Sequence, residues 1–190
     1  MITQLPGYGP ETPVSIFQWE PEFQVALDLY QRVQPETVLE VGTYHGGTLY
    51  HWLRNAAPGA RIVSLDSYAV GVDNRHLYDE WVPEGVSLTV LEGDSNSADT
   101  AERVAEHGPF EWAFIDAGHY YHEVKEDWLL YGPMVADGGV ALFHDILPPS
   151  AEHPEIEVAR LWEEIKLEHN CLEIVADREA SWGGIGVVQL

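Results

Sequence analysis

The sequence has few positive charges. Lys and Arg together number 9 against 32 Asp and Glu, which gives a formal net charge of -23 at pH 7. A chain with this charge repels phosphate backbones and anionic membrane surfaces, so we expect neither nucleic acid nor membrane as a partner. Most of the acidic side chains are expected to form a solvated surface and to carry no function of their own.

Cysteine and long hydrophobic runs are also scarce. Cys171 is the only cysteine, which excludes an intramolecular disulfide framework. It lies in an apolar stretch, which favours a small buried side chain over a nucleophile. No basic-then-apolar leader is recognised, and no apolar run approaches the roughly 20 residues of a membrane span. These absences predict a cytoplasmic location.

Apolar residues make up 45% of the 190 residues and include 7 Trp, so a packed core is expected. The length predicts a single domain over residues 19–190. Residues 1–18 contain several Pro and Gly and no periodicity, and they predict an N-terminal loop. This loop could act as a lid over a ligand site, and an inert tail is equally consistent with the composition.

Apolar runs typical of strands alternate with patterns typical of helices. Strands are expected at residues 38–41, 61–65, 86–91, 112–115, 140–143, 171–176 and 185–188. Helices are expected at residues 19–33, from Thr48, around 73–81, from Ser97 to before Gly108, over a pattern of Val124, Trp128 and Leu129, and from Pro154. This order predicts an α/β fold with a doubly wound, mostly parallel seven-stranded sheet and a C-terminal antiparallel hairpin. The hairpin could also present an edge for a homo-oligomer.

The most informative stretch runs from residue 37 to residue 50, T-V-L-E-V-G-T-Y-H-G-G-T-L-Y. It predicts a buried strand, a turn with Gly42, Gly46 and Gly47, and a helix that begins at Thr48. The glycines are interpreted as room for a ligand close to the backbone. The helix N-terminus would attract negative charge.

This stretch differs from a dinucleotide-binding fingerprint, because Tyr44 occupies the position of the second glycine. Its pattern E-x-G-x-x-x-G-G resembles the first motif of class I S-adenosylmethionine (SAM)-dependent methyltransferases. In the form V-L-E-x-G-x-Y it is most similar to the metal-dependent catechol-type O-methyltransferases and their small bacterial relatives. A generic strand-turn-helix of an α/β protein is the alternative.

The resemblance implies that SAM binds at the ends of the strands. Asp66, at the end of the second strand, would accept the ribose hydroxyls, and its distance from Gly46 is typical of nucleoside-binding units. Glu40 would order the turn near the methionine end. Either acid could instead cap a neighbouring helix. The other predicted cofactor contacts are Gly42, Tyr44, Gly46, Thr48, Asp94, Ser95 and Asp116.

Asp116, His144 and Asp145 end two strands that are expected to be neighbours. Oxygen ligands that converge in this way suit Mg²⁺. The catechol-type resemblance implies a metal here, with Asp116 at the position of the first acid and His144-Asp145 at the position of an acid-amide pair. Imidazole suits Mn²⁺, Fe²⁺ or Zn²⁺ better than Mg²⁺, so His144 could be a ligand or could orient Asp145. A site without metal is also known on this fold.

His119 follows Asp116 by three residues, so both could lie on one face. The segment F-I-D-A-G-H-Y resembles the F-I-D-G-D-H-x-Y stretch of the small bacterial group, with Gly118 in place of the second acid. In the catechol-type family a lysine at this offset takes the proton of the substrate hydroxyl, and a histidine can do the same near neutral pH. A helix-start residue bonded to the backbone is the alternative.

The sequence therefore predicts a SAM-dependent O-methyltransferase that acts on a small hydroxylated acceptor. Asp116 and His119 are its predicted catalytic residues, and a divalent metal, Mg²⁺ or Mn²⁺, its predicted second cofactor. The alternatives are a metal-dependent hydroxylase or hydrolase on the same sheet and a non-catalytic SAM-binding module. Catechol, sugar, polyketide and peptidic hydroxyls all stay open as acceptors. The segments expected to shape the acceptor pocket are residues 1–18, 68–85 and 146–154.

Overall fold

The computed structural model describes residues 14–69 and 73–190. These residues form one seven-stranded sheet with the order β3-β2-β1-β4-β5-β7-β6. The strands are β1 (Thr37–Val41), β2 (Arg61–Asp66), β3 (Ser87–Glu92), β4 (Phe110–Ile115), β5 (Val135–His144), β6 (Asn170–Ile174) and β7 (Ile185–Gln189). Strands β1 to β5 are parallel, and β7 runs antiparallel to both β5 and β6. The predicted fold class is confirmed.

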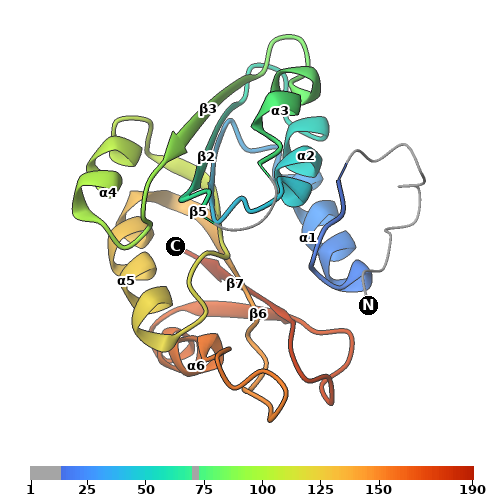
Figure 1. The fold of residues 1–190 in the computed structure, drawn as a ribbon, viewed down its shortest axis with the longest axis vertical. Coiled ribbons are helices and arrows are strands. Elements are labelled where there is room, and N and C mark those ends of the chain that lie inside the picture. Colours follow the sequence, from blue (N-terminus) through green and yellow to red (C-terminus); the bar gives the residue numbers. More distant parts are fainter. Residues whose placement is uncertain (1–13, 70–72) are drawn as a thin grey trace.

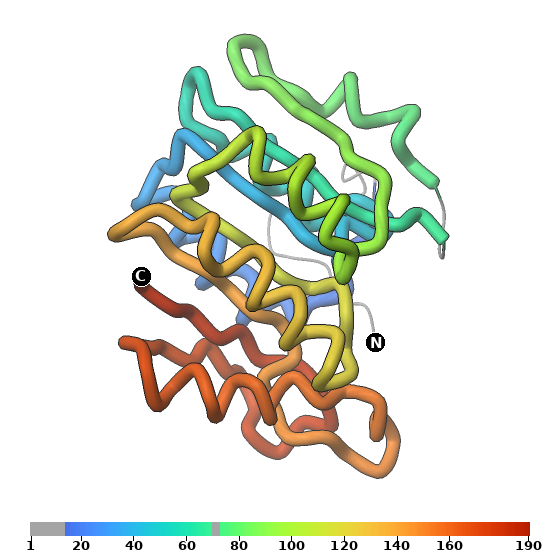
Figure 2. Tube along the Cα trace, turned by 90° about the vertical axis from the view of Figure 1, so that its left-hand side faces the viewer, coloured from blue at the N-terminus to red at the C-terminus, as the bar shows by residue number. Residues whose placement is uncertain are grey.

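Helices cover both faces of this sheet (Figures 1 and 2). They are α1 (Glu20–Val33), α2 (Gly47–Arg54), α3 (Arg75–Trp81), α4 (Ala98–Ala105), α5 (Tyr121–Tyr131) and α6 (Val158–Glu168), with a 3-10 turn η1 (Gly132–Met134) after α5. Figure 1 shows α1, α2 and α3 on one face and α4, α5 and α6 on the other. No helix among the described residues is long and apolar enough to cross a membrane.

The central strands contribute to two cores, one on each face. In β1, Leu39 and Val41 pack with residues of α4, α5 and α6, while Val38 packs with residues of α1, α2 and α3. All five residues of β1 are buried, as expected for a parallel strand covered on both sides. The middle of the sheet is therefore filled by side chains, and a ligand can approach only at the strand ends.

Helix α6 begins at Val158, four residues after Pro154, so the predicted helix start was wrong. Tertiary contacts of Glu157, the residue before the helix, explain the difference. Its backbone N–H donates to the carbonyl of His119 at 2.8 Å, and its carboxylate accepts the backbone N–H of Tyr121 at 3.0 Å. The helix therefore starts where the chain is anchored to the segment that leads into α5.

Other boundaries differ by smaller amounts. Strand β5 begins at Val135, five residues before the predicted start, because its pairing with β4 continues through a register shift. Strand β6 ends at Ile174, two residues before the predicted end. Ser97 occupies the predicted position before α4, but its side chain makes no capping hydrogen bond. Leu129 is 58% exposed and points away from the core.

The predicted C-terminal antiparallel hairpin is confirmed and consists of β6 and β7. Strand β7 inserts between β5 and β6, so β6 forms one edge and β3 the other. The strand order reverses direction between β1 and β4. In open α/β sheets ligands bind beyond the carboxyl ends of the strands at this reversal.

Candidate active site at the carboxyl ends of the strands

A cavity of about 610 Å³ lies at the carboxyl ends of β1, β2, β4 and β5. Its volume is within the range of sites that hold small molecules and cofactors. All but two of the predicted site residues line it. The lining set is Gly42, Tyr44, Thr48, Asp66, Asp94, Ser95, Asp116, His119, His144 and Asp145.

Gly46 and Glu40 are the two predicted residues outside the lining. Gly46 has a φ of +85°, and a Cβ on it would lie 2.9 Å from the rings of Tyr78 and Trp81. A Cβ on Gly42 would collide with the backbone of Asp116, and Gly42 has a φ of +95°. These glycines are therefore required because the protein packs closely against itself, a reason that adds to the predicted room for a ligand.

Glu40 lies behind the glycine turn with its side chain fully buried. Its Oε1 accepts hydrogen bonds from the hydroxyl of Thr48 at 2.6 Å and from the indole N–H of Trp52 at 3.1 Å. Burial raises the pKa of Glu40 to about 8, although these hydrogen bonds lower it. The charge of Asp116 also raises the pKa of Glu40. The carboxyl group thus joins β1 to the first turn of α2.

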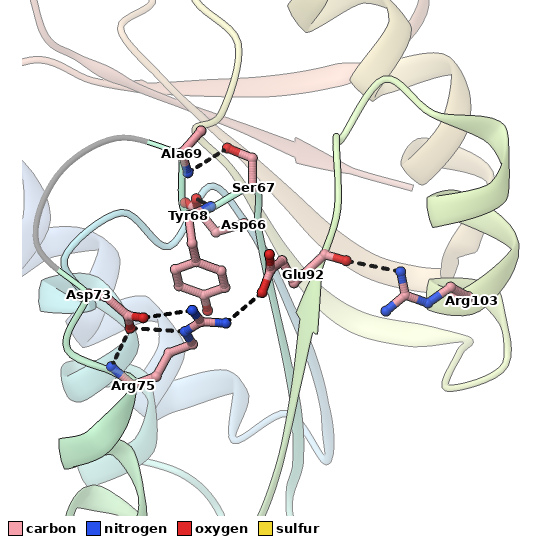
Figure 3. A network of polar contacts seen from close by, with 8 residues as sticks. All are labelled: Asp66, Ser67, Tyr68, Ala69, Asp73, Arg75, Glu92 and Arg103. Atoms are coloured by element: carbon pink, nitrogen blue, oxygen red, sulfur yellow. Dashed lines mark hydrogen bonds and ion pairs between the residues drawn. The ribbon is translucent and has the colours of Figure 1, made fainter.

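The Asp66 carboxylate is held in place by backbone amides. Its Oδ2 accepts the N–H of Tyr44 at 2.6 Å, and its Oδ1 accepts the N–H of Tyr68 at 2.6 Å (Figure 3). Asp66 caps no helix in the described part of the chain, and it forms part of the cavity wall. On the adjacent wall, Asp94 Oδ1 accepts the backbone N–H of Asn96 at 3.0 Å.

Four titratable side chains converge at the other end of the cavity. The Nδ1 of His144 lies 3.3 Å from Asp116 Oδ1 and 3.4 Å from Asp145 Oδ2. The Nε2 of His119 lies 3.2 Å from Asp145 Oδ2 and 3.9 Å from Asp116 Oδ1. One ligand atom from each of Asp116, His144 and Asp145 lies within 4.8 Å of the others. The structure thus brings the predicted metal and catalytic residues together.

The charges in this cluster support one another. Burial opposes a charge on His144, but the carboxylates of Asp145 and Asp116 outweigh it and raise its pKa well above the usual value. The hydrogen bond that His119 donates to Asp145 raises the pKa of His119. Burial alone would raise the pKa of Asp145, yet the two histidines keep it below its usual range. The two histidines therefore stabilise the charged form of the Asp145 carboxylate.

Residues 39–146 match the family described as "Methyltransferase domain". The chain belongs to this methyltransferase family. The match begins in β1 and ends just after Asp145, so it contains every predicted site residue. Membership of the SAM-dependent methyltransferases is thereby confirmed at the level of the family, and a hydroxylase or hydrolase on the same sheet is set aside. The sequence matches no curated protein.

Solved structures of O-methyltransferases share the fold. An enzyme from Bacillus cereus, in complex with SAH, is 18% identical with a TM-score of 0.65, and the match covers 95% of this chain and 84% of that one. TomG from Streptomyces achromogenes, in complex with SAM, is 17% identical with a TM-score of 0.64 and coverages of 95% and 82%. At these identities the likeness shows the fold alone.

The MycE methyltransferase from the mycinamycin biosynthetic pathway, in complex with Mg and SAH, is 22% identical with a TM-score of 0.58. The match covers 89% of this chain but 48% of MycE. The chain therefore spans about half the length of that enzyme.

The segment before α1 also contributes to the methyltransferase site. The predicted lid lies outside the described residues as far as residue 13, but residues 15–18 line the cavity. The ring of Phe17 packs edge-on against Tyr44 at 5.1 Å, and Gln18 Nε2 donates to Asp116 Oδ2 at 2.6 Å. Residue 15 packs against Gly47, whose added Cβ would collide with the Ser15 carbonyl. This segment therefore closes one side of the site.

Several functional contacts were missed from the sequence. Gln18 lies 98 residues from Asp116 along the chain, and no local pattern signals their contact. The backbone N–H of Gly183 donates to Asp145 Oδ1 at 3.0 Å, and Asp145 itself has a φ of +63°. The Gly183-Gly184 pair was visible only as a break between strands. Trp182 and His153 also line the cavity.

Proposed function

We propose that this methyltransferase moves the methyl group of SAM to a hydroxyl oxygen of a small acceptor, with help from a divalent metal. The observation that carries the proposal is the placement of two kinds of groups in one cavity. Asp66 and Asp94 line one end, and the cluster of Asp116, His119, His144 and Asp145 lines the other. The neighbours whose titles name O-methyltransferases and SAH or SAM support the choice of oxygen and of cofactor.

The cofactor end suits a nucleoside. Both oxygens of Asp66 are oriented by backbone N–H groups and remain able to accept ribose hydroxyls, because a carboxylate oxygen accepts more than one hydrogen bond. Asp94 and Ser95 would lie on the adenine side. The methionine end would face the turn that Glu40 and Thr48 hold together.

The metal end has the donors that a divalent cation requires. Atoms that bind Mg²⁺ at adjacent octahedral positions are roughly 3 Å apart, and His144 Nδ1 lies 3.3 and 3.4 Å from the two carboxylates. Asp116 and Asp145 would hold the ion, with His144 as a third ligand or as the group that orients Asp145. A bound cation would lower the pKa of the acceptor hydroxyl. The Mg named in the MycE title supports this assignment.

The chain's own residues would position the acceptor and remove its proton. The His119 side chain is 41% exposed, so its imidazole is accessible to an acceptor. With Nε2–H donating to Asp145, the other ring nitrogen, Nδ1, would accept the hydroxyl proton, and Asp145 would stabilise the imidazolium formed. The acceptor oxygen then forms a bond to the methyl carbon while the carbon–sulfur bond breaks, which leaves SAH. Holding the two reactants in line can supply roughly 7–11 kcal/mol of the barrier lowering.

Transfer of an isotopically labelled methyl group tests the proposal. Purified protein with labelled SAM and Mg²⁺ or Mn²⁺ is incubated with catechol, sugar and polyketide acceptors, and products are identified by mass spectrometry and NMR. We expect an O-methyl product. The variant His119→Gln should lower kcat by roughly 10²–10⁴-fold, while His122→Gln, on the exposed side of α5, should retain wild-type kcat. Full activity of His119→Gln, or a product methylated on nitrogen or carbon, would contradict the assignment.

A further inference from the structure

The cavity wall has no positively charged side chain of Lys or Arg among the described residues. The acids that line it are Asp66, Asp94, Asp116, Glu123 and Asp145. Four histidines also line the wall, namely His45, His119, His144 and His153. The segments outside the described residues, 1–13 and 70–72, contain neither Lys nor Arg in the sequence, so they bring no such side chain to the site.

The cations near the site are engaged elsewhere. Arg75 contacts Asp73 at 2.6 Å and Glu92 at 2.7 Å, and Figure 3 shows its guanidinium between these two carboxylates. Arg178, four residues before Trp182, contacts Glu173 at 3.0 Å. The guanidinium of Arg160 lies 3.7 Å from the centre of the Tyr121 ring. An anionic acceptor would therefore find no free Lys or Arg partner on the described wall.

The carboxylates outnumber the permanent cations on the wall. Five acids line the cavity, and no Lys or Arg does so among the described residues. A carboxylate or phosphate that enters such a cavity loses water without gaining a Lys or Arg partner. Neutral and positively charged molecules avoid this loss.

The acceptor side of the cavity also suits a cation. The Trp182 ring lines the wall. Its centroid lies 6.2 Å from the ring centroid of His144 and 6.4 Å from that of His153. An ammonium group over an indole face is attracted by the ring electrons. Glu155 Oε1 lies 3.4 Å from His153 Nδ1, so a further carboxylate lies next to this part of the wall.

We infer that the acceptor is a hydroxylated molecule that is uncharged or bears an amine, and that the site discriminates against acceptors with a carboxylate or phosphate. The inference rests on the proposed function, because it concerns the acceptor of that same site. It follows from the absence of Lys and Arg on the described cavity wall together with the acids and the indole that form it.

A matched set of three probes tests this inference. Dopamine, 4-methylcatechol and 3,4-dihydroxyphenylacetate share one catechol ring and differ in the charge of the side group. Their affinity for the protein loaded with SAH and Mg²⁺ is measured by calorimetry at about 20 mM and about 500 mM NaCl. We expect the amine-bearing and neutral probes to bind at least about tenfold more tightly than the carboxylate at low salt. The difference should shrink at high salt.

Two matched variants locate the effect. His153→Arg places a cation on the cavity wall. This variant should reduce the ratio of the affinity for the amine-bearing probe to the affinity for the carboxylate probe. His122→Arg makes the same change on the exposed face of α5 and should leave the ratio unchanged. Equal or tighter binding of the carboxylate probe in the wild type, or no binding of any probe to the loaded protein, would overturn the inference. Failure of the proposed function is distinguishable, because the labelled-methyl assay would then give no O-methyl product, whichever probes bind.

Discussion

Glu40 is an acid in the middle of a hydrophobic sheet, and its environment makes its charge costly. Thr48 and Trp52 donate to its Oε1, but burial outweighs these hydrogen bonds and raises the pKa to about 8 from an ordinary value of 4.5. The folded state therefore keeps a proton that the unfolded chain releases. The free energy of unfolding should fall as the pH rises from about 4.5 to about 8.

Glu40→Gln removes this titration and keeps an oxygen to accept both hydrogen bonds. Relative to the wild type, the variant should gain about 1–3 kcal/mol of unfolding free energy between pH 5 and pH 8.5, measured by urea unfolding at each pH. Glu106→Gln, at an exposed position after α4, serves as the control and should show no such gain. A pH-independent difference between Glu40→Gln and the wild type would show that Glu40 is ionised throughout.

The role of Asp66 shows both the strength and the limit of single-residue prediction. Its position at the end of the second strand could be read from the apolar run before it. The two amides that orient its carboxylate could not, because they depend on the left-handed backbone of Tyr44 and Tyr68. Gln18 and Gly183 were missed for a related reason, since their contacts form only when distant segments meet.

At the scale of elements, α5 connects the two ends of the cavity wall. Asp127 on this helix is fully buried, and its Oδ1 accepts the side-chain amide of Asn96 at 2.7 Å. The same amide nitrogen donates to the carbonyl of Glu123 at 3.0 Å. Asn96 follows Asp94 and Ser95 directly, so α5 fixes the loop that would face the adenine. This link was not predicted from the helical pattern, which gave Val124, Trp128 and Leu129.

Asp127→Ala should therefore affect stability and cofactor affinity together. We expect a loss of about 1–3 kcal/mol of unfolding free energy, because the half-buried amide of Asn96 loses a partner, and a weaker affinity for SAH. Urea unfolding and calorimetry measure the two quantities. Glu126→Ala, at the adjacent exposed position, should change neither. If Asp127→Ala lowers stability and leaves the SAH affinity intact, the loop is held by other contacts.

The order of elements was predictable, and their ends were less so. Periodicity and turn residues gave all seven strands, because a covered parallel strand is a short apolar run between polar turns. The predicted start of α6 was wrong because contacts with His119 and Tyr121 fix Glu157. These contacts join residues distant in the sequence, so local sequence patterns do not reveal them. The glycines of the first turn were correctly marked, and the packing of the chain against itself adds a reason for them.

At the scale of the whole molecule, the strand order places the chemistry. Asp116 follows β4 and His144 ends β5, and these strands are neighbours in the sheet. Their carboxyl ends therefore deliver the cluster to one point, next to the turn after β1. This convergence could be expected from the sequence once a doubly wound sheet was predicted. The predicted cytoplasmic location and the homo-oligomer through the hairpin edge remain predictions.

Calorimetric titration of SAM and SAH into the wild type and into Asp66→Ala tests whether the cavity binds SAM through Asp66. We expect micromolar binding of both ligands by the wild type. For Asp66→Ala we expect an affinity at least about tenfold weaker, equivalent to about 1.4 kcal/mol, and a cooperative thermal unfolding transition that shows an intact fold. Absence of binding to the wild type, with or without Mg²⁺ or Mn²⁺, would contradict the assignment of this cavity to SAM.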